Sequence, residues 1–298
     1  MKLDKILVAF DFSPASRKAL DQAKALARGR EIRVRIVHRL SPSLAAVRPL
    51  VTAHESWVEI GQFLDTHNGQ ERDKTTDELD WIVESAGNDV LVEHVIAEGV
   101  TAVEAIEEQV RSWEPDLVVV GSHGARGIGQ LLLGSVASEL LHRLDVAVML
   151  VREESRLFEA GSVGPIVAPV DFSDHSQRAL GFARGLVDLY DGSLHLLHAV
   201  ELAHTPFKKG GLTSRLDSEA GLREKYVAAL EGMLGGSKGE VSVEDGSAAG
   251  TILWARERQD AQLVVMGSRG LTGLPHLLVG SVAEKVARFC EVPVIIVR

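Results

Sequence analysis

The sequence has one cysteine, Cys290, among its 298 residues. A lone cysteine cannot form a disulfide within the chain, and such sparse use of cysteine is typical of a reducing compartment. The opening residues, MKLDKILVAFDFS, lack the small-residue cleavage site of a secretory signal. No apolar run approaches the roughly 20 residues of a membrane span. We therefore expect a soluble, cytoplasmic protein without a membrane partner.

An excess of basic residues is also missing. The chain has 32 Lys and Arg against 42 Asp and Glu, which gives a formal net charge of −10 at pH 7. Binding to nucleic acid phosphates depends on clustered Lys and Arg, so this balance argues against a nucleic acid partner. The hydrophobic fraction of 45% and the charged fraction of 25% are those of a globular protein.

Common catalytic and metal-binding motifs are absent. The chain has no GxxxxGK[ST] loop, no GxSxG elbow and no HExxH among its 11 histidines. His195 and His198 stand at an odd separation in a strand-like run, which places them on opposite faces and makes them a poor metal chelator. We therefore expect neither a P-loop NTPase nor a metal site, and we assign no catalytic residue.

An internal repeat, however, is present. ILVAFDFSPASRKAL, residues 6–20, aligns with IVAPVDFSDHSQRAL, residues 166–180. A repeat of this length is a duplicated domain rather than a solenoid unit. We expect domains at 1–153 and 162–298, with a linker at 154–161 inside a junction that is charged and then rich in Gly and Ser.

Each copy alternates strand and helix patterns. Residues 6–10 are a continuous apolar run, as expected for a parallel strand buried on both faces. Ser13 and Pro14 then supply an N-cap and a first helical residue, and the apolar residues that follow recur on one helical face. The fold class predicted is α/β, with two doubly wound, open parallel five-stranded sheets and helices on both faces. Further elements of the first copy are expected as strands at 34–37, 90–96, 117–120 and 146–151, and as helices at 102–113 and from 134 onward.

Two expectations concern parts outside this shared pattern. The last strands, VAVMLVR and VPVIIVR, are too apolar for an uncovered sheet edge, so we expect the two copies to pair there. The first copy has an additional polar stretch at 54–87, in which Trp57 and Trp81 are predicted to be core residues of a longer helix pair.

A glycine pattern follows the fourth strand of each copy. GSHGARGIGQLLLGS at 121–135 and GSRGLTGLPHLLVGS at 267–281 both read Gly, two residues, Gly, nine residues, Gly-Ser. If the strand order is 3-2-1-4-5, the order reverses between the first and fourth strands, where ligands bind, and Asp11 faces the first glycine segment. Glycines allow close approach of a ligand, and the following helix start offers N–H groups to a phosphate. Asp11 suits ribose hydroxyls or a base amino group, so the pattern predicts a mononucleotide site.

This pattern, joined to an ILVAxD-type opening strand, resembles the universal stress protein family, and its duplication is similar to the tandem-domain members. The likeness covers nearly the whole chain, least so in the middle of the first copy. It implies the sheet order 3-2-1-4-5, a cytoplasmic stress-response role and binding of ATP, ADP or AMP, with Mg²⁺ left open as a companion ion. The nucleotide-binding residues it implies are Asp11, Val37, His38, Gly121, Gly124, Gly134, Ser135 and Val136 in the first copy, and Asp171, Leu197, His198, Gly267, Gly270, Gly280, Ser281 and Val282 in the second.

Other interpretations stay open. The glycines can be purely architectural, the two aspartates can orient the loops that follow them, and His38 and His198 can be hydrogen-bonded strand-end residues. Neither glycine segment contains a lysine, so a regulatory binding protein is favoured over an enzyme. The alternatives are a slow ATPase at the same site, a nucleotide-free scaffold for a protein partner, and a carrier of an apolar ligand in the enlarged first copy. A homodimer and an unknown regulatory protein partner are also left open.

Overall fold

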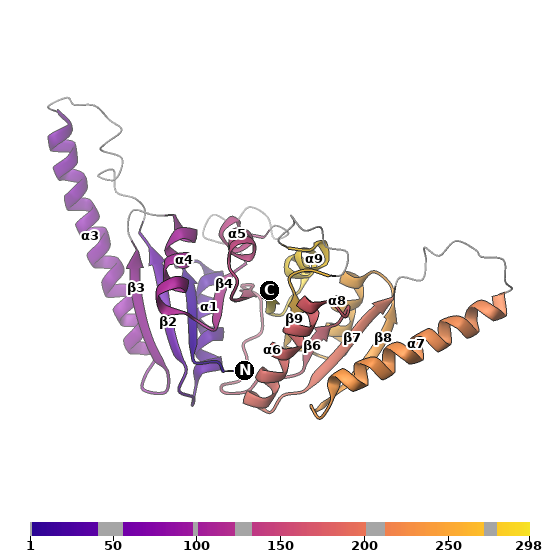
Figure 1. Cartoon of the computed structure of the whole chain (residues 1–298). Helices are drawn as coiled ribbons and strands as arrows, with labels where there is room; N and C mark the ends of the chain where they lie inside the picture. The colour runs from indigo at the N-terminus through magenta and orange to yellow at the C-terminus, as the bar shows by residue number, and fades with distance from the viewer. Residues whose placement is uncertain (1, 41–55, 98–100, 123–132, 201–211, 271–278) are drawn as a thin grey trace.

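The computed structural model describes residues 2–40, 56–97, 101–122, 133–200, 212–270 and 279–298 (Figure 1). For 56–68, 70–71 and 212–220 it describes the backbone alone.

The helices and strands follow the repeat. The first copy contains β1 (Lys5–Phe10), α1 (Pro14–Ala27), β2 (Arg33–Arg39), α3 (Ser56–Ser85), β3 (Leu91–Ala97), α4 (Ala102–Trp113), β4 (Leu117–Gly121), α5 (Ser135–Arg143) and β5 (Ala147–Val151). The second contains β6 (Ile166–Pro169), α6 (Asp174–Tyr190), β7 (Leu194–Val200), α7 (Leu212–Leu234), β8 (Gly239–Asp245), α8 (Ala248–Arg258), β9 (Leu263–Gly267), α9 (Ser281–Phe289) and β10 (Val294–Val297). The predicted strands and helices are confirmed, with ends that move by one or two residues.

All ten strands form one sheet, in the order β3-β2-β1-β4-β5-β10-β9-β6-β7-β8. Within each copy the strands are parallel in the predicted order 3-2-1-4-5. The copies join through β5 and β10, which pair antiparallel with Met149 opposite Ile295. The expected pairing of the two apolar last strands is therefore confirmed, and neither strand is left as an edge (Figure 1).

Side chains alternate across this sheet and build two cores. Ile6 in β1 belongs to the core under α1, α3, α6 and α7, and its neighbour Leu7 belongs to the core under α4, α5, α8 and α9. Both residues are 0% exposed, because a parallel strand with helices on both faces has no wet side. Met149 and Ile295, which face each other where the copies meet, lie in the first of these cores. Each core therefore runs through both copies.

The structure corrects one expectation about the additional stretch of the first copy. Its described part is the single helix α3, and Trp81 is 67% exposed on that helix instead of belonging to a core. Leu79 and Ile82 are the buried residues of this stretch, at 0% and 5% exposure. A helix beside the outermost strand buries only one stripe, so Trp81 lies on its outer side. The side chain of Trp57 lies outside the described residues.

A buried glutamine reinforces the junction of the copies. Gln22 in α1 is 0% exposed. Its amide nitrogen donates to the carbonyl oxygen of Arg156, and its amide oxygen accepts from the N–H of Phe158 over 3.0 Å. Nearby, the hydroxyl of Tyr190 in α6 donates to the carbonyl oxygen of Leu26 in α1 over 2.8 Å. The chain that connects the copies is thus hydrogen-bonded to the first copy, and a helix of the second copy docks beside it.

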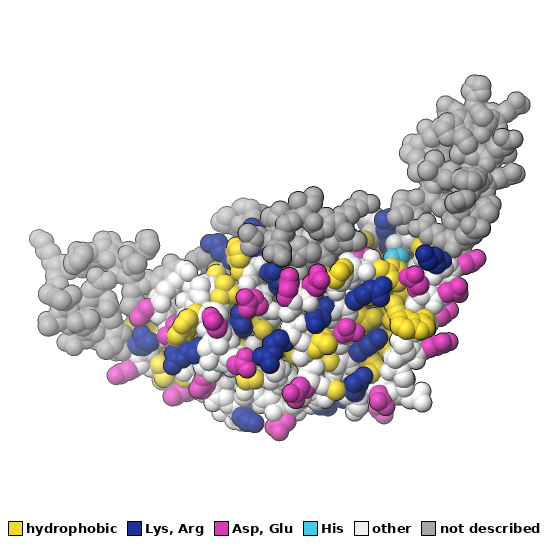
Figure 2. Space-filling view, turned by 180° about the vertical axis from the view of Figure 1, so that it is seen from behind, with side chains coloured by type: hydrophobic (Ala, Val, Ile, Leu, Met, Phe, Trp, Pro, Cys, Tyr) yellow, Lys and Arg dark blue, Asp and Glu magenta, His cyan; other side chains and the backbone are white. Residues whose placement is uncertain are grey.

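The surface carries charges of both signs. On the described part of the face seen from behind, acidic and basic side chains are interspersed (Figure 2). Interspersed charges create no broad field of one sign such as a polyanion seeks. A separate finding concerns the helices: of those in the described ranges, none combines the length and the apolar character that crossing a bilayer requires.

Replacing Gln22 by Met should lower the free energy of unfolding by about 1–3 kcal/mol, because two buried backbone groups lose their partner at nearly constant side-chain volume. Urea denaturation of the full chain measures the change. Gln177, on the exposed start of α6, is the matched control, and Gln177→Met should cost less than about 0.5 kcal/mol. Equal effects of the two substitutions would contradict the role of Gln22.

Candidate functional site

Each copy turns sharply from its first strand into its first helix, and an aspartate orients that turn. In the second copy, Asp171 Oδ1 accepts from the N–H of Ser173 over 3.1 Å and from its hydroxyl over 2.6 Å. Phe172 between them has φ 65°, a left-handed conformation that bulky residues seldom adopt. In the first copy, Asp11 Oδ1 accepts from the N–H of Ser13 over 3.0 Å, and the intervening residue has φ 63°. One carboxylate oxygen of each aspartate is therefore committed to the turn.

The second oxygen of Asp171 faces the glycine segment. A Cβ placed on Gly270 would overlap Asp171 Oδ2, so the carboxylate lies directly against the bare main chain that follows β9. The chain after β6 and the chain after β9 thus lie side by side, although Asp171 and Gly270 are far apart in the sequence. Any larger residue at position 270 would displace the carboxylate. In the first copy, Gly124 lies outside the described residues.

The first glycine of each pattern has a packing role. A Cβ on Gly121 would lie 2.9 Å from the backbone carbon of Ala15 in α1. A Cβ on Gly267 would lie 2.8 Å from the backbone carbon of His175 in α6. Real Cβ atoms do not approach backbone that closely, so these glycines let the fourth strand of each copy end against the first turn of a helix. The architectural interpretation therefore applies to Gly121 and Gly267.

The last glycine of each pattern starts a helix. The N–H of Gly280 donates to the carbonyl oxygen of Ser268 over 2.7 Å, and that of Gly134 donates to Ser122 over 2.6 Å. These bonds hold the start of α9 beside the end of β9 and the start of α5 beside the end of β4. Where α1 and α6 are capped by serine side chains, α5 and α9 begin at glycine, with no side-chain cap among the described residues.

Uncapped N–H groups at a helix start are suited to an anion. The serines that follow the glycines, Ser135 and Ser281, are exposed, whereas Val136 and Val282 are half-buried against the core. The valines can therefore offer a ligand their backbone N–H groups, and the exposed serines can offer hydroxyls as well. The start of each of these two helices is built from main chain and small side chains.

The strand-end histidines are hydrogen-bonded to the neighbouring strand. His38 Nδ1 donates to the carbonyl oxygen of Phe10 over 2.8 Å, and His198 Nδ1 donates to that of Val170 over 2.7 Å. A carbonyl only accepts, so Nδ1 carries the proton in both rings. Beside them, Val37 and Leu197 are 3% and 1% exposed, which leaves only their backbone groups for a ligand. These contacts agree with the interpretation of His38 and His198 as hydrogen-bonded residues at the ends of their strands.

The second copy adds a residue that the sequence patterns do not reveal. Tyr226 in α7 lies 4.4 Å from the ring of His198 and stacks on Phe172 at 5.8 Å between ring centroids. An aromatic wall therefore stands beside the turn that holds Asp171. Tyr226 lies in the region where the two copies differ most in length, so the repeat gave no signal for it.

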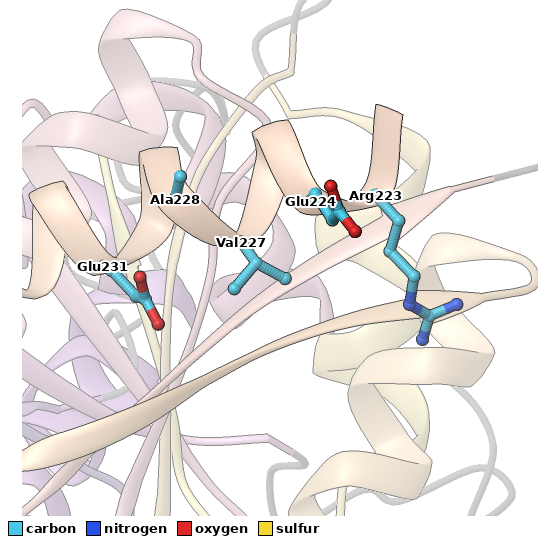
Figure 3. Close-up of a pocket in the computed structure, with 5 residues that line it drawn as sticks. All are labelled: Arg223, Glu224, Val227, Ala228 and Glu231. Carbon is cyan, nitrogen blue, oxygen red and sulfur yellow. The ribbon is translucent and has the colours of Figure 1, made fainter. Parts of the chain in front are cut away.

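A pocket elsewhere on the second copy does not suit the predicted ligand. It is lined by one helix, α7, and Figure 3 shows two carboxylates and one guanidinium along it. The guanidinium of Arg223 pairs with Asp245 over 3.3 Å, which leaves Glu224 and Glu231 to repel a phosphate. Its lining residues are Arg223, Glu224, Val227, Ala228 and Glu231.

Comparisons with known proteins agree with the repeat. The model of the universal stress protein family matches residues 2–152 and 163–298. Universal stress protein Rv2623 of Mycobacterium tuberculosis (strain ATCC 25618 / H37Rv) is 30% identical over 301 residues, which covers 98% of this chain and 96% of that one. Universal stress protein MJ0531 of Methanocaldococcus jannaschii is 32% identical over 139 residues, which covers 45% of this chain and 81% of that one. The crystal structure of a universal stress protein from Archaeoglobus fulgidus DSM 4304 has TM-score 0.64 at 23% identity, and the match covers 100% of this chain and 99% of that one.

Gly121→Ala and Gly267→Ala should each lower the free energy of unfolding by about 1–3 kcal/mol, because the new methyl group must push a helix away from the strand end. Gly181 in α6 is the control, since a Cβ there meets nothing within 4 Å. Gly181→Ala should raise stability by about 0.5–1 kcal/mol. Chemical denaturation compares the three variants, and a neutral result at 121 and 267 would refute the packing role.

Proposed function

The chain belongs to the universal stress protein family, and we propose that it binds an adenine nucleotide in the crevice between the ends of β6 and β9. The equivalent crevice between β1 and β4 is proposed as a second site. The observation that carries this proposal is the contact of the Asp171 carboxylate with the bare main chain of Gly270. It supports a site in which an acidic side chain lies against main chain that carries no side chain.

Each part of a nucleotide has a partner of suitable chemistry. The N–H groups of the first turn of α9, at Ser281 and Val282, are proposed to bind the phosphates, because the helix dipole and uncapped donors favour an anion. Asp171 Oδ2 is proposed to accept hydrogen bonds from ribose hydroxyls. Small and main-chain groups on this side let the ligand approach closely. The corresponding groups of the first copy are Asp11, Ser135 and Val136.

Binding is proposed to be regulatory. Fast phosphoryl transfer needs a lysine or arginine on the phosphates, a metal-holding carboxylate and a base for the nucleophile. Neither glycine segment has a lysine, and each has a single arginine, Arg126 in the first and Arg269 in the second. The described residues also contain no group of three His, Cys, Asp or Glu side chains able to hold a metal. A Mg²⁺ ion that arrived with ATP would be held mainly by the phosphates.

The two copies are proposed to act as separate binding domains, 1–153 and 162–298, on one continuous sheet. Residues 154–161 are proposed as the linker. The pairing of β5 with β10 leaves the carboxyl ends of β4 and β9 available for separate ligands. The bound nucleotide would then favour one conformation of the protein, or one state of its contact with a protein partner, because the nucleotide binds that state more tightly than the other.

The crevice is tested by closing it. A chain with Gly124→Val reports on the second site alone, and adding Gly270→Val should abolish the remaining ATP binding because the new side chain occupies the place of Asp171 Oδ2. Isothermal titration calorimetry with ATP measures binding. Gly236→Val is the matched control, since a Cβ there meets nothing within 4 Å. Undiminished affinity in the Gly124→Val, Gly270→Val chain would place the site elsewhere.

Asp171→Ala should weaken binding at the second site by about 1–3 kcal/mol, through the loss of charge-assisted hydrogen bonds. Asp171→Asn separates the two roles of the residue. Its amide oxygen can still accept from Ser173, so the turn and the thermal stability should be kept while affinity falls. If the Asn variant binds ATP as tightly as the unmodified chain, the carboxylate serves only the turn.

A further inference from the structure

The last strand of each copy is followed by an arginine that reaches the other copy. Arg152 follows β5 and Arg298 follows β10, at corresponding positions of VAVMLVR and VPVIIVR. Because β5 and β10 pair antiparallel, with Leu150 opposite Val294, the end of each strand lies beside the turn that leads into the other. The turn before β10 comes from α9, and the turn before β5 comes from α5. The strand pairing therefore brings each arginine to the end of a helix in the other copy.

Each arginine binds the last turn of that helix. Arg152 Nη1 donates to the carbonyl oxygen of Arg288 in α9 over 2.9 Å. Arg298 Nη1 donates to the carbonyl oxygen of Leu144, the C-cap residue of α5, over 2.9 Å. The last four carbonyl groups of an α-helix have no partner within the helix. Both guanidinium groups therefore bind carbonyl oxygens that helix geometry leaves open.

The two arginines are largely buried, whereas their acidic partners are exposed. The side chain of Arg152 is 17% exposed and that of Arg298 is 15% exposed. Glu154, 3.5 Å from Arg152, and Asp145, 3.1 Å from Arg298, are 59% and 96% exposed. An ion pair with so exposed a carboxylate contributes little to stability. A cation at a helix C-terminus, by contrast, is favourable because the helix dipole places partial negative charge there.

The arginines that the two helices carry themselves are engaged with carboxylates. Arg288 Nη2 in α9 lies 2.7 Å from Glu284, one turn earlier in the same helix. Arg143 in α5 pairs with Glu139 over 2.8 Å and with Glu107 in α4 over 3.2 Å. The guanidinium on the last carbonyl groups of each helix therefore comes from the other copy.

The same two helices begin at the proposed nucleotide sites. α5 starts at Ser135 and α9 starts at Ser281, and each has nine residues. Nine residues span about 13 Å. A rigid helix of this length transmits position, so a guanidinium that holds its last turn also helps to hold its first turn. The charge acts in the same direction, because a cation at the far end of the helix attracts an anionic ligand at its start.

We propose that Arg152 is a positioning residue of the second nucleotide site and Arg298 a positioning residue of the first, so that each copy completes the site of the other. The inference rests on the proposed nucleotide binding. It gives the pairing of β5 with β10 a role in binding as well as in covering two apolar strands. It also gives the arginines a crossed effect: loss of one should weaken the site of the copy that does not contain it.

Single-site chains test the proposal. The Gly270→Val chain keeps the first site and the Gly124→Val chain keeps the second, and isothermal titration calorimetry measures the binding of ATP to each. Arg152→Met should weaken the second site about two- to fivefold, the range that a charge at a helix end produces, and should leave the first site unchanged. Arg298→Met should weaken the first site to a similar extent and leave the second unchanged.

Further variants separate the anchoring of the helices from side-chain volume and from contacts between the copies in general. Arg152→Lys and Arg298→Lys keep a cation that can donate to a carbonyl oxygen, so they should retain most of the affinity that the Met variants lose. Arg156→Met is the matched control. Arg156 also joins the copies, to Asp260 over 3.2 Å, but this pair is exposed and follows α8 rather than a helix that starts at a nucleotide site. Arg156→Met should change neither affinity.

Hydrogen exchange separates this inference from the proposed function. In chains without ATP, Arg152→Met should speed amide exchange in α9 more than in α5, and Arg298→Met should do the reverse, because a helix that has lost its anchor opens more often. If neither single-site chain binds ATP, the proposed function fails, and exchange alone decides whether the arginines hold the helices. Equal losses at both sites, a loss in the copy that contains the substituted arginine, Met and Lys variants that bind alike, or exchange without the crossed pattern would overturn the inference.

Discussion

The contact on which the site depends is between a carboxylate and a residue without a side chain. Asp171 Oδ2 occupies the space that a Cβ of Gly270 would need, so the two segments are close only because position 270 is glycine. The turn that aims the carboxylate is held by hydrogen bonds to Ser173 and by a left-handed Phe172. Backbone strain of this kind persists only where the surrounding structure over-determines it. The same turn recurs in the first copy, which indicates that the geometry is retained with the duplication.

Duplication also explains the shape of the sheet. A domain with the order 3-2-1-4-5 ends in an apolar strand that needs a cover. Here each copy covers the other, as β5 and β10 pair and both cores become continuous across the junction. Gln22 adds buried hydrogen bonds from α1 to the connecting chain, and Tyr190 adds one from α6 to α1. The copies have diverged elsewhere: the second carries Tyr226 beside its turn and His175 beneath its loop, where the first has Ala15.

Much of this fold could be predicted because its signals are local or repeated. The apolar run at 6–10 is as expected for a strand buried on both faces. The strand order that places the fourth strand beside the first followed from the family resemblance that the repeated glycine spacing supports. Trp81 could not be placed in the same way. An aromatic residue in a polar helix is compatible with either face, and exposure depends on where α3 lies against the sheet. Likewise, no pattern distinguishes the packing glycines 121 and 267 from glycines that face a ligand. That distinction needs the helix position in three dimensions.

The most direct test of the central claim is a crystal structure of the chain grown with a saturating concentration of ATP. The account predicts nucleotide density in the crevice between the ends of β6 and β9, with the ribose against Asp171 and the phosphates at the start of α9. Density at another surface, or side chains of the protein itself filling the space between the ends of β6 and β9 at saturating nucleotide, would contradict it.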